Sequence, residues 1–287
     1  MRNRNSPINA DRAARREKRS LQLRRKAADI RQGRDEFFRL LVERFYGRPF
    51  FRQSAVSTAD LEHGLTLILP GIEAAGPYAQ AMVDGLLGAV PGAVRIFHWG
   101  IAFPEGYFPN LMWLRRNRAR AAELVQIIQS YQDQYPGRPV HVVANSGGAG
   151  PAIFAVEMLP PDRSIDGLVF LSGAVSSTYD LRPALRRLRK GIYNFYSHRD
   201  WIVLGIGTCL FGTSDRKPQV SCGFVGFKRP AKLCDAENLY AKVHQDIWTP
   251  ALVDECNHWG THGFSACPEY IRRYVAPWIA RNANSAE

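Results

Sequence analysis

A serine near the middle of the chain stands between small residues, directly after an apolar run. Residues 139–143 lead into Ala144-Asn145-Ser146-Gly147-Gly148, and the helix-prone residues 149–159 follow. A serine at the apex of a strand-to-helix turn needs strained backbone angles. The residues two before and two after it must be small so that strand and helix can pass closely. The pattern therefore predicts a nucleophile elbow with Ser146 at its tip.

Two other glycine-rich motifs fit this segment poorly. Gly148 and Gly150 could open the dinucleotide motif G-x-G-x-x-G, but its third glycine would fall on Ile153, and no strand ends in an acidic residue at the expected distance beyond. A phosphate-binding loop would need a Lys-Ser or Lys-Thr pair after the glycines, and none follows. A tight turn with an ordinary serine stays open as an alternative.

An acid and a base should follow the serine, each after a strand. Asp200 comes directly after the β-prone, aromatic-rich residues 191–197. Two histidines compete further on, after a less clear strand at 247–253. We favour His262, because it precedes Gly263 and the predicted C-terminal helix 268–281. His258 is the alternative base, although it could equally point into the core.

The three residue types belong to one chemistry. A serine hydroxyl is a poor nucleophile until an imidazole removes its proton, and a buried carboxylate must orient that imidazole. The negative charge that develops on the attacked oxygen needs two N–H donors. We expect these from the backbone amides of Gly147 and of Ile72, which follows the apolar run 64–69 and Pro70-Gly71. This chemistry calls for neither a cofactor nor a metal ion.

Together these residues resemble the α/β-hydrolase superfamily, in particular its serine esterases and lipases, over roughly residues 60–283. The resemblance implies a mostly parallel, doubly wound sheet flanked by helices, with Ser146 as nucleophile, Asp200 as acid and His262 as base. The chain departs from the family pattern in two places. Ala144 replaces the first glycine of G-x-S-x-G, and residues 69–72 replace the lipase His-Gly-Gly-Gly loop. The second departure leaves the substrate open.

Hydrophobic patterns support this architecture. Alternating strands and helices favour a parallel sheet with helices on both faces. The link between the strands expected at 167–171 and 191–197 is about twenty residues long, which is too short for a large cap domain. Residues 201–246 are expected to fold over the entrance to the site. Strands are expected at 65–69, 94–98, 139–144, 167–171 and 191–197, and helices at 76–89, 111–134, 150–158 and 180–189.

Charge divides the chain. The formal net charge is +12, and residues 1–50 hold 15 Lys or Arg against 6 Asp or Glu. We therefore expect a basic N-terminal extension, partly helical or disordered, over 1–58 and a catalytic domain over 59–287. The extension could contact an anionic surface of lipid or nucleic acid. Without an apolar segment of transmembrane length or a signal sequence, a cytoplasmic protein is expected, with peripheral membrane contact as an option.

The predicted reaction is hydrolysis of an ester in a small acyl substrate, through an acyl-enzyme on Ser146. Amides and thioesters would use the same groups, so a serine peptidase or an acyltransferase remains open. A different class of function is a catalytically inactive binding or membrane-surface module of the same fold. Aromatic residues that could line the substrate pocket are Tyr107, Phe108, Trp113 and Trp201.

Overall fold

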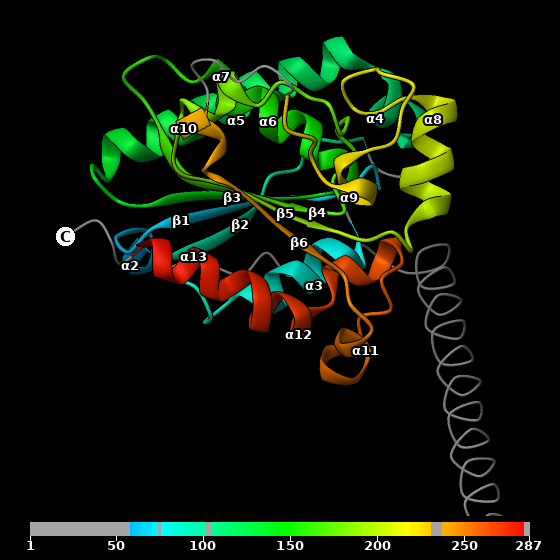
Figure 1. Ribbon diagram of the computed structural model, residues 1–287. Coiled ribbons are helices and arrows are strands. Elements are labelled where there is room, and N and C mark those ends of the chain that lie inside the picture. Colours follow the sequence, from blue (N-terminus) through cyan, green and yellow to red (C-terminus); the bar gives the residue numbers. More distant parts are fainter. Residues whose placement is uncertain (1–57, 74–75, 102–104, 231–236, 284–287) are drawn as a thin grey trace, which may run out of the picture. The chain divides into compact units, whose positions relative to one another are not determined.

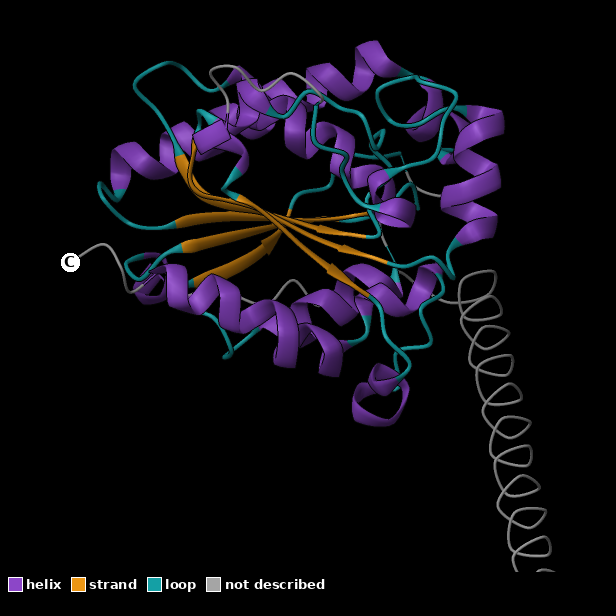
Figure 2. Cartoon of the chain, in the orientation of Figure 1, coloured by secondary structure: helices purple, strands orange, loops and turns teal. Residues whose placement is uncertain are grey.

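A single parallel sheet forms the centre of the protein. The computed structural model describes residues 58–73, 76–101, 105–230 and 237–283. Within them, six strands are hydrogen-bonded in the order β2-β1-β3-β4-β5-β6, and each neighbouring pair is parallel. Figure 2 shows them as one twisted sheet between helices. The strands are β1 (Leu65–Leu69), β2 (Ala93–Ile96), β3 (Val140–Asn145), β4 (Ile165–Leu171), β5 (Leu188–Tyr196) and β6 (Val243–Ile247).

Helices cover both faces of the sheet (Figure 1). On one face lie α5 and α6, and on the other lie α3, α12 and α13. The helices of six or more residues are α3 (Pro77–Leu86), α4 (Tyr107–Met112), α5 (Leu114–Gln134), α6 (Ala149–Met158), α11 (Ala251–Cys256) and α13 (Ala276–Ala283). Shorter helices are α2 (Thr58–Leu61), α7 (Arg182–Leu185), α8 (Thr208–Phe211), α9 (Cys222–Val225), α10 (Glu237–Tyr240) and α12 (Pro268–Tyr270). Two 3-10 segments, η1 (Ser146–Gly148) and η3 (His262–Ala266), and two π-helical segments, η2 (Trp201–Gly207) and η4 (Ile271–Val275), complete the described helical structure.

Burial explains why the central strands are mostly apolar. All residues of β1, β3 and β4 are buried. Successive side chains point to opposite faces, so Val142 packs with the α5 and α6 layer while Val143 packs with the α3 and α13 layer. Strands that are covered on both faces favour apolar residues at most positions, and the polar exceptions, such as His141 and Asp166, are buried as well. The predicted doubly wound parallel sheet is therefore confirmed.

Two predicted elements were wrong. The helix expected at 180–189 is confined to α7, and β5 already begins at Leu188. The last strand is β6, Val243–Ile247, whereas residues 251–253 of the strand expected at 247–253 belong to α11. β6 lies at the sheet edge with His244, Gln245 and Asp246 exposed, so it lacks the apolar pattern by which the other strands were found.

The remaining connections bear on the site. Only α7 lies between β4 and β5, so no cap domain is inserted there. Residues 201–230, which follow β5, contain η2, α8 and α9 and lie on the α5 and α6 side in Figure 1. Apart from Thr58, the predicted N-terminal extension falls outside the described residues. None of the helices in the described ranges is long and apolar enough to cross a bilayer.

Candidate active site

Ser146 sits at the tip of the turn between β3 and α6. Its φ angle of 49° lies in the left-handed region, which a residue with a side chain rarely occupies. The small residues around it are required sterically. A Cβ atom on Gly148 would lie 2.4 Å from the Pro70 carbonyl oxygen, and one on Gly150 would lie 2.6 Å from Ser214 Cβ. The structure thus contains the strained elbow that the sequence predicts.

A chain of hydrogen bonds links the serine to a histidine and an acid. His262 Nε2 lies 2.8 Å from Ser146 Oγ, and His262 Nδ1 lies 2.6 Å from Asp200 Oδ2. Three segments supply these groups: the turn after β3, the segment after β5 and η3 near the C-terminus. The structure therefore brings together the three residues that were selected from the sequence.

Burial differs along this chain. The Asp200 side chain is 1% exposed, while that of His262 is 26% exposed. The Asp200 backbone is fixed on both sides, because its N–H donates to the Ser197 carbonyl and its carbonyl accepts from Leu204 N–H, each at 3.1 Å. A carboxylate held in this way can orient the imidazole, while the other end of the imidazole stays accessible to a substrate.

The two residues proposed as oxyanion donors, Gly147 and Ile72, lie next to each other. A Cβ atom on Gly147 would be 3.6 Å from the Ile72 nitrogen, which places the loop after β1 against the elbow. The amide of Gly147 immediately follows Ser146, at the start of the short helices η1 and α6. Free N–H groups at a helix start favour negative charge nearby. Gly147 and Ile72 are thus adjacent at the mouth of the elbow.

The loop that carries Ile72 is held from several directions. Trp99 Nε1 donates to the Pro70 carbonyl at 2.7 Å, and Asn110 Nδ2 donates to the Ile72 carbonyl at 2.7 Å. Arg116 in turn donates to the Trp99 carbonyl and to Asn110 Oδ1. Reasoning from the sequence missed these residues. Their partners are backbone atoms 29 and 38 residues away, and no local motif signals such a pairing.

His258 occupies a different place from His262. It is buried, its Nδ1 accepts the Gly260 N–H at 3.0 Å, and its ring meets the Tyr270 ring edge-on at 4.4 Å. Burial lowers the pKa of His258 to about 4, so the ring is neutral at pH 7. Its carbonyl accepts from Trp248 Nε1 at 2.7 Å. These contacts shape the turn that leads to His262.

A second network reaches His262 from the elbow. Asn145 Nδ2 donates to the Leu171 carbonyl and to Ser265 Oγ, both at 3.1 Å. Ser265 Oγ donates to the His262 carbonyl, also at 3.1 Å. Both side chains are buried. The residue before the serine is therefore connected through Ser265 to the backbone of the histidine, a positioning contact that no sequence motif predicts.

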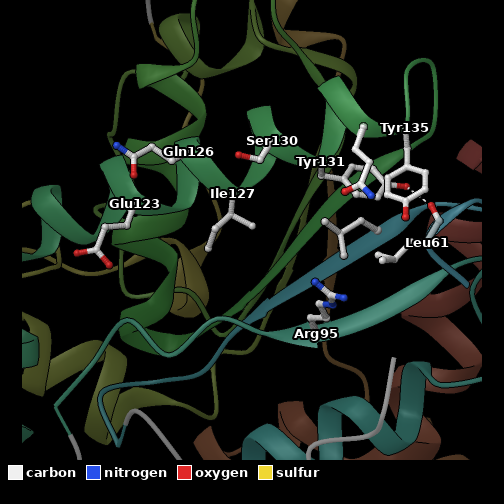
Figure 3. Close-up of a pocket in the computed structure, with 10 residues that line it drawn as sticks. Leu61, Arg95, Glu123, Gln126, Ile127, Ser130, Tyr131 and Tyr135 are labelled. Carbon is white, nitrogen blue, oxygen red and sulfur yellow. Dashed lines mark hydrogen bonds between the residues drawn. The ribbon is translucent and has the colours of Figure 1, made fainter. Parts of the chain in front are cut away.

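The predicted pocket residues are only partly described. Trp113 and Trp201 are 56% and 53% exposed, and the side chains of Tyr107 and Phe108 lie outside the described part. A separate pocket of about 470 Å³ lies between α5 and the strands β1 and β2 (Figure 3). It is lined by Arg95, Glu123, Tyr131 and their neighbours, and none of the predicted site residues takes part.

The sheet order and the serine elbow after β3 agree with the α/β-hydrolase fold that the sequence resembles. No family model and no curated protein matches the sequence. The matching solved structures include a putative esterase from Staphylococcus aureus, at 11% identity and a TM-score of 0.43, covering 78% of this chain and 76% of that one.

Two further matches are similarly distant. SOBER1 of Arabidopsis thaliana is 13% identical, with a TM-score of 0.41 and coverage of 76% and 98% of the two chains. Aspergillus fumigatus lipase B is 12% identical, with a TM-score of 0.45 and coverage of 79% and 54%. Similarities this distant do not assign the activity of any of these proteins to this chain.

Proposed function

We propose that the protein is a serine hydrolase that cleaves an ester bond in a small acyl substrate. The observation that carries this proposal is the hydrogen-bonded chain from Ser146 Oγ through His262 to the buried carboxylate of Asp200, at 2.8 and 2.6 Å. Distances in this range allow proton transfer between the heavy atoms. A turn built only for packing has no need of a strained serine aligned with an imidazole and an acid.

In the proposed first step, Ser146 Oγ attacks the ester carbonyl carbon while His262 Nε2 accepts the hydroxyl proton. Asp200 keeps the proton on Nδ1 and stabilises the imidazolium that forms. The carbonyl oxygen becomes an oxyanion, which the amides of Gly147 and Ile72 would stabilise. Collapse of this intermediate breaks the ester C–O bond, and His262 gives its proton to the leaving alcohol. The acyl group remains on Ser146.

Water completes the proposed cycle. His262 Nε2 removes a proton from the water molecule as its oxygen attacks the acyl carbon, and the same two amides hold the second oxyanion. The bond to Ser146 Oγ then breaks, the serine regains its proton from His262, and a carboxylic acid leaves. Esters are the first choice because an alkoxide is a better leaving group than the amide anion that an unprotonated amide would have to expel, so esters demand least of the site.

The first test is covalent labelling with a fluorophosphonate. An activated serine displaces fluoride from phosphorus and keeps the phosphonyl group, which intact-mass and peptide mass spectrometry locate. We expect an adduct on Ser146 that is absent from Ser146→Ala, together with turnover of p-nitrophenyl esters. Ser172→Ala is a matched control, because Ser172 is also buried with a φ angle of 50° but lies outside the hydrogen-bonded chain.

The choice of base is tested in parallel. His262→Ala should lower kcat by several powers of ten, whereas His258→Ala should mainly lower thermal stability. A folded protein that neither labels nor turns over esters would contradict the proposal and favour an inactive binding module. Normal turnover in His262→Ala would contradict the assigned base.

A further inference from the structure

The segment directly after Asp200 exposes an unusual apolar surface. η2 and α8 together form one helical stretch from Trp201 to Phe211. Six large apolar side chains on it, which we call the apolar face, are between 41% and 73% exposed. They are Trp201, Ile202, Val203, Ile206, Leu210 and Phe211.

The opposite side of this stretch is anchored to the protein. Leu204, Gly205 and Thr208 are buried, and Leu204 accepts hydrogen bonds on its carbonyl from Thr208 Oγ1 at 2.6 Å and from Ser221 Oγ at 3.2 Å. The helix therefore buries Leu204, Gly205 and Thr208 and turns the apolar face outward. Solubility would favour the reverse arrangement, so the apolar face calls for an occupant.

Charge around the apolar face is positive. Residues 201–214 contain no charged residue, and the exposed side chains of Arg199, Arg216 and Lys217 flank the stretch. The two acids next to the stretch in the sequence are inward. Asp200 is 1% exposed, and Asp215 is 7% exposed, accepts hydrogen bonds from the backbone and side chain of Ser176 and lies 3.9 Å from Lys217 Nζ, whose side chain is 52% exposed. An uncharged apolar helix face with cations at its margins complements an anionic bilayer surface.

We propose that the apolar face docks on the surface of an anionic phospholipid bilayer. Its large side chains, with an indole at the start of the helix, would enter the headgroup and acyl boundary, while Arg199, Arg216 and Lys217 contact lipid phosphates or carboxylates. This inference does not depend on the proposed hydrolase activity, since it concerns a surface outside the Ser146–His262–Asp200 chain.

The exposed thiol of Cys209 offers a direct probe, because it lies within the same helix. The full-length protein would be labelled with an environment-sensitive NBD fluorophore. It would then be mixed with vesicles of phosphatidylcholine alone or with added phosphatidylserine. Cys209→Ser, labelled in the same way, gives the background from other thiols. We expect a blue shift from position 209 with the anionic vesicles, reduced by salt and absent from the background sample.

A matched pair of variants tests the apolar face itself. Leu210→Asp should weaken partitioning into anionic vesicles roughly tenfold or more, because it places a carboxylate at the lipid boundary. Leu87→Asp is the control, since Leu87 is 53% exposed at the end of α3, which packs on the other face of the sheet. It should partition like the unchanged protein. Circular dichroism would verify the fold of both variants.

Three results would overturn the proposal. In the first, vesicles bind but the probe at position 209 does not respond, which would assign the contact to another part of the chain. In the second, Leu210→Asp partitions no more weakly than Leu87→Asp. In the third, the probe is already shielded without vesicles, either in the monomer or in a self-associated form that Leu210→Asp abolishes. The occupant would then be this chain's own segment or a second copy.

Discussion

Adding one methyl group at the elbow should damage both the fold and the reaction. Gly148 has helical angles, φ −62° and ψ −20°, so alanine could adopt the same backbone conformation, and helix propensity alone favours Gly148→Ala. The space around position 148, however, is too small for a methyl group. The new Cβ would lie 2.4 Å from the Pro70 carbonyl oxygen and 2.6 Å from the Leu69 carbonyl oxygen, whereas nine in ten real Cβ contacts are at 3.4 Å or more.

The size of the effect follows from what must move. Both obstructing atoms are backbone atoms, one from the last residue of β1 and one from the loop that follows, and Trp99 Nε1 fixes the Pro70 carbonyl at 2.7 Å. Overpacking that displaces backbone costs about 3 kcal/mol, at the upper end of the usual range. For a folded region of this size, that lowers Tm by roughly 6–12 °C. The displaced loop also carries the Ile72 amide, and losing one oxyanion donor lowers kcat by about 10²-fold.

The assay compares Gly148→Ala with Gly205→Ala by differential scanning fluorimetry and ester turnover. Gly205 is buried within η2, but there a new Cβ would be 3.5 Å from the nearest atom of the Phe224 ring, an ordinary contact. The free energy of unfolding of Gly205→Ala should change by less than about 1 kcal/mol in either direction. Its Tm should therefore shift by no more than roughly 4 °C. Equal Tm values and equal kcat in the two variants would refute the argument that the elbow requires glycine at position 148.

Two further predictions concern the candidate site, and a third concerns a buried histidine inside β3. Asp200→Asn should lower kcat by about 10⁴-fold with little change in Tm, because His262 loses the carboxylate that orients it; steady-state ester kinetics with a melting curve check this. Ser265→Ala, which removes the contacts to Asn145 and to the His262 carbonyl, should lower kcat about tenfold and shift the pH profile of kcat/KM while KM stays constant. A lower Tm with unchanged kcat would reduce Ser265 to a packing role. Burial lowers the pKa of His141 to about 4, so the unfolded state binds more protons between pH 6.5 and 4. The contribution of His141 to the free energy of unfolding should therefore fall by up to about 3 kcal/mol as the pH drops through that window, and denaturant titrations should show a correspondingly smaller fall in His141→Leu.

The elements that the sequence predicted well are those whose burial is complete. β3 and β4 are covered on both faces and are apolar at most positions. The serine elbow could be predicted from Ala144 and Gly148, because only small residues fit there. β6 escaped prediction, since an edge strand with His244 and Asp246 exposed carries no apolar run.

The supports of the candidate site were not predictable for a different reason. Asn110, Trp99 and Ser265 act through backbone carbonyls of segments that meet only after the sheet has formed. Hydrogen bonds to main-chain atoms leave no complementary residue type in the sequence, so neither spacing nor composition could reveal them. The residue types of the proposed triad could be predicted from their order and context. The residues that hold them in place can be recognised only in the folded structure.

The apolar face and the candidate site are neighbours in the chain and share a helical turn. Trp201 follows Asp200 directly, and the Asp200 carbonyl accepts from Leu204 N–H at 3.1 Å, so the acid forms the first turn of the exposed helix. A lipid surface that engaged Trp201 and Ile202 would lie within about two helical turns of the carboxylate that orients His262. Under the two proposals together, the Asp200→Asn variant should keep its vesicle binding while losing turnover. Leu210→Asp should keep turnover of a water-soluble ester while losing vesicle binding. Loss of both functions in either variant would mean that the helix and the acid do not act independently.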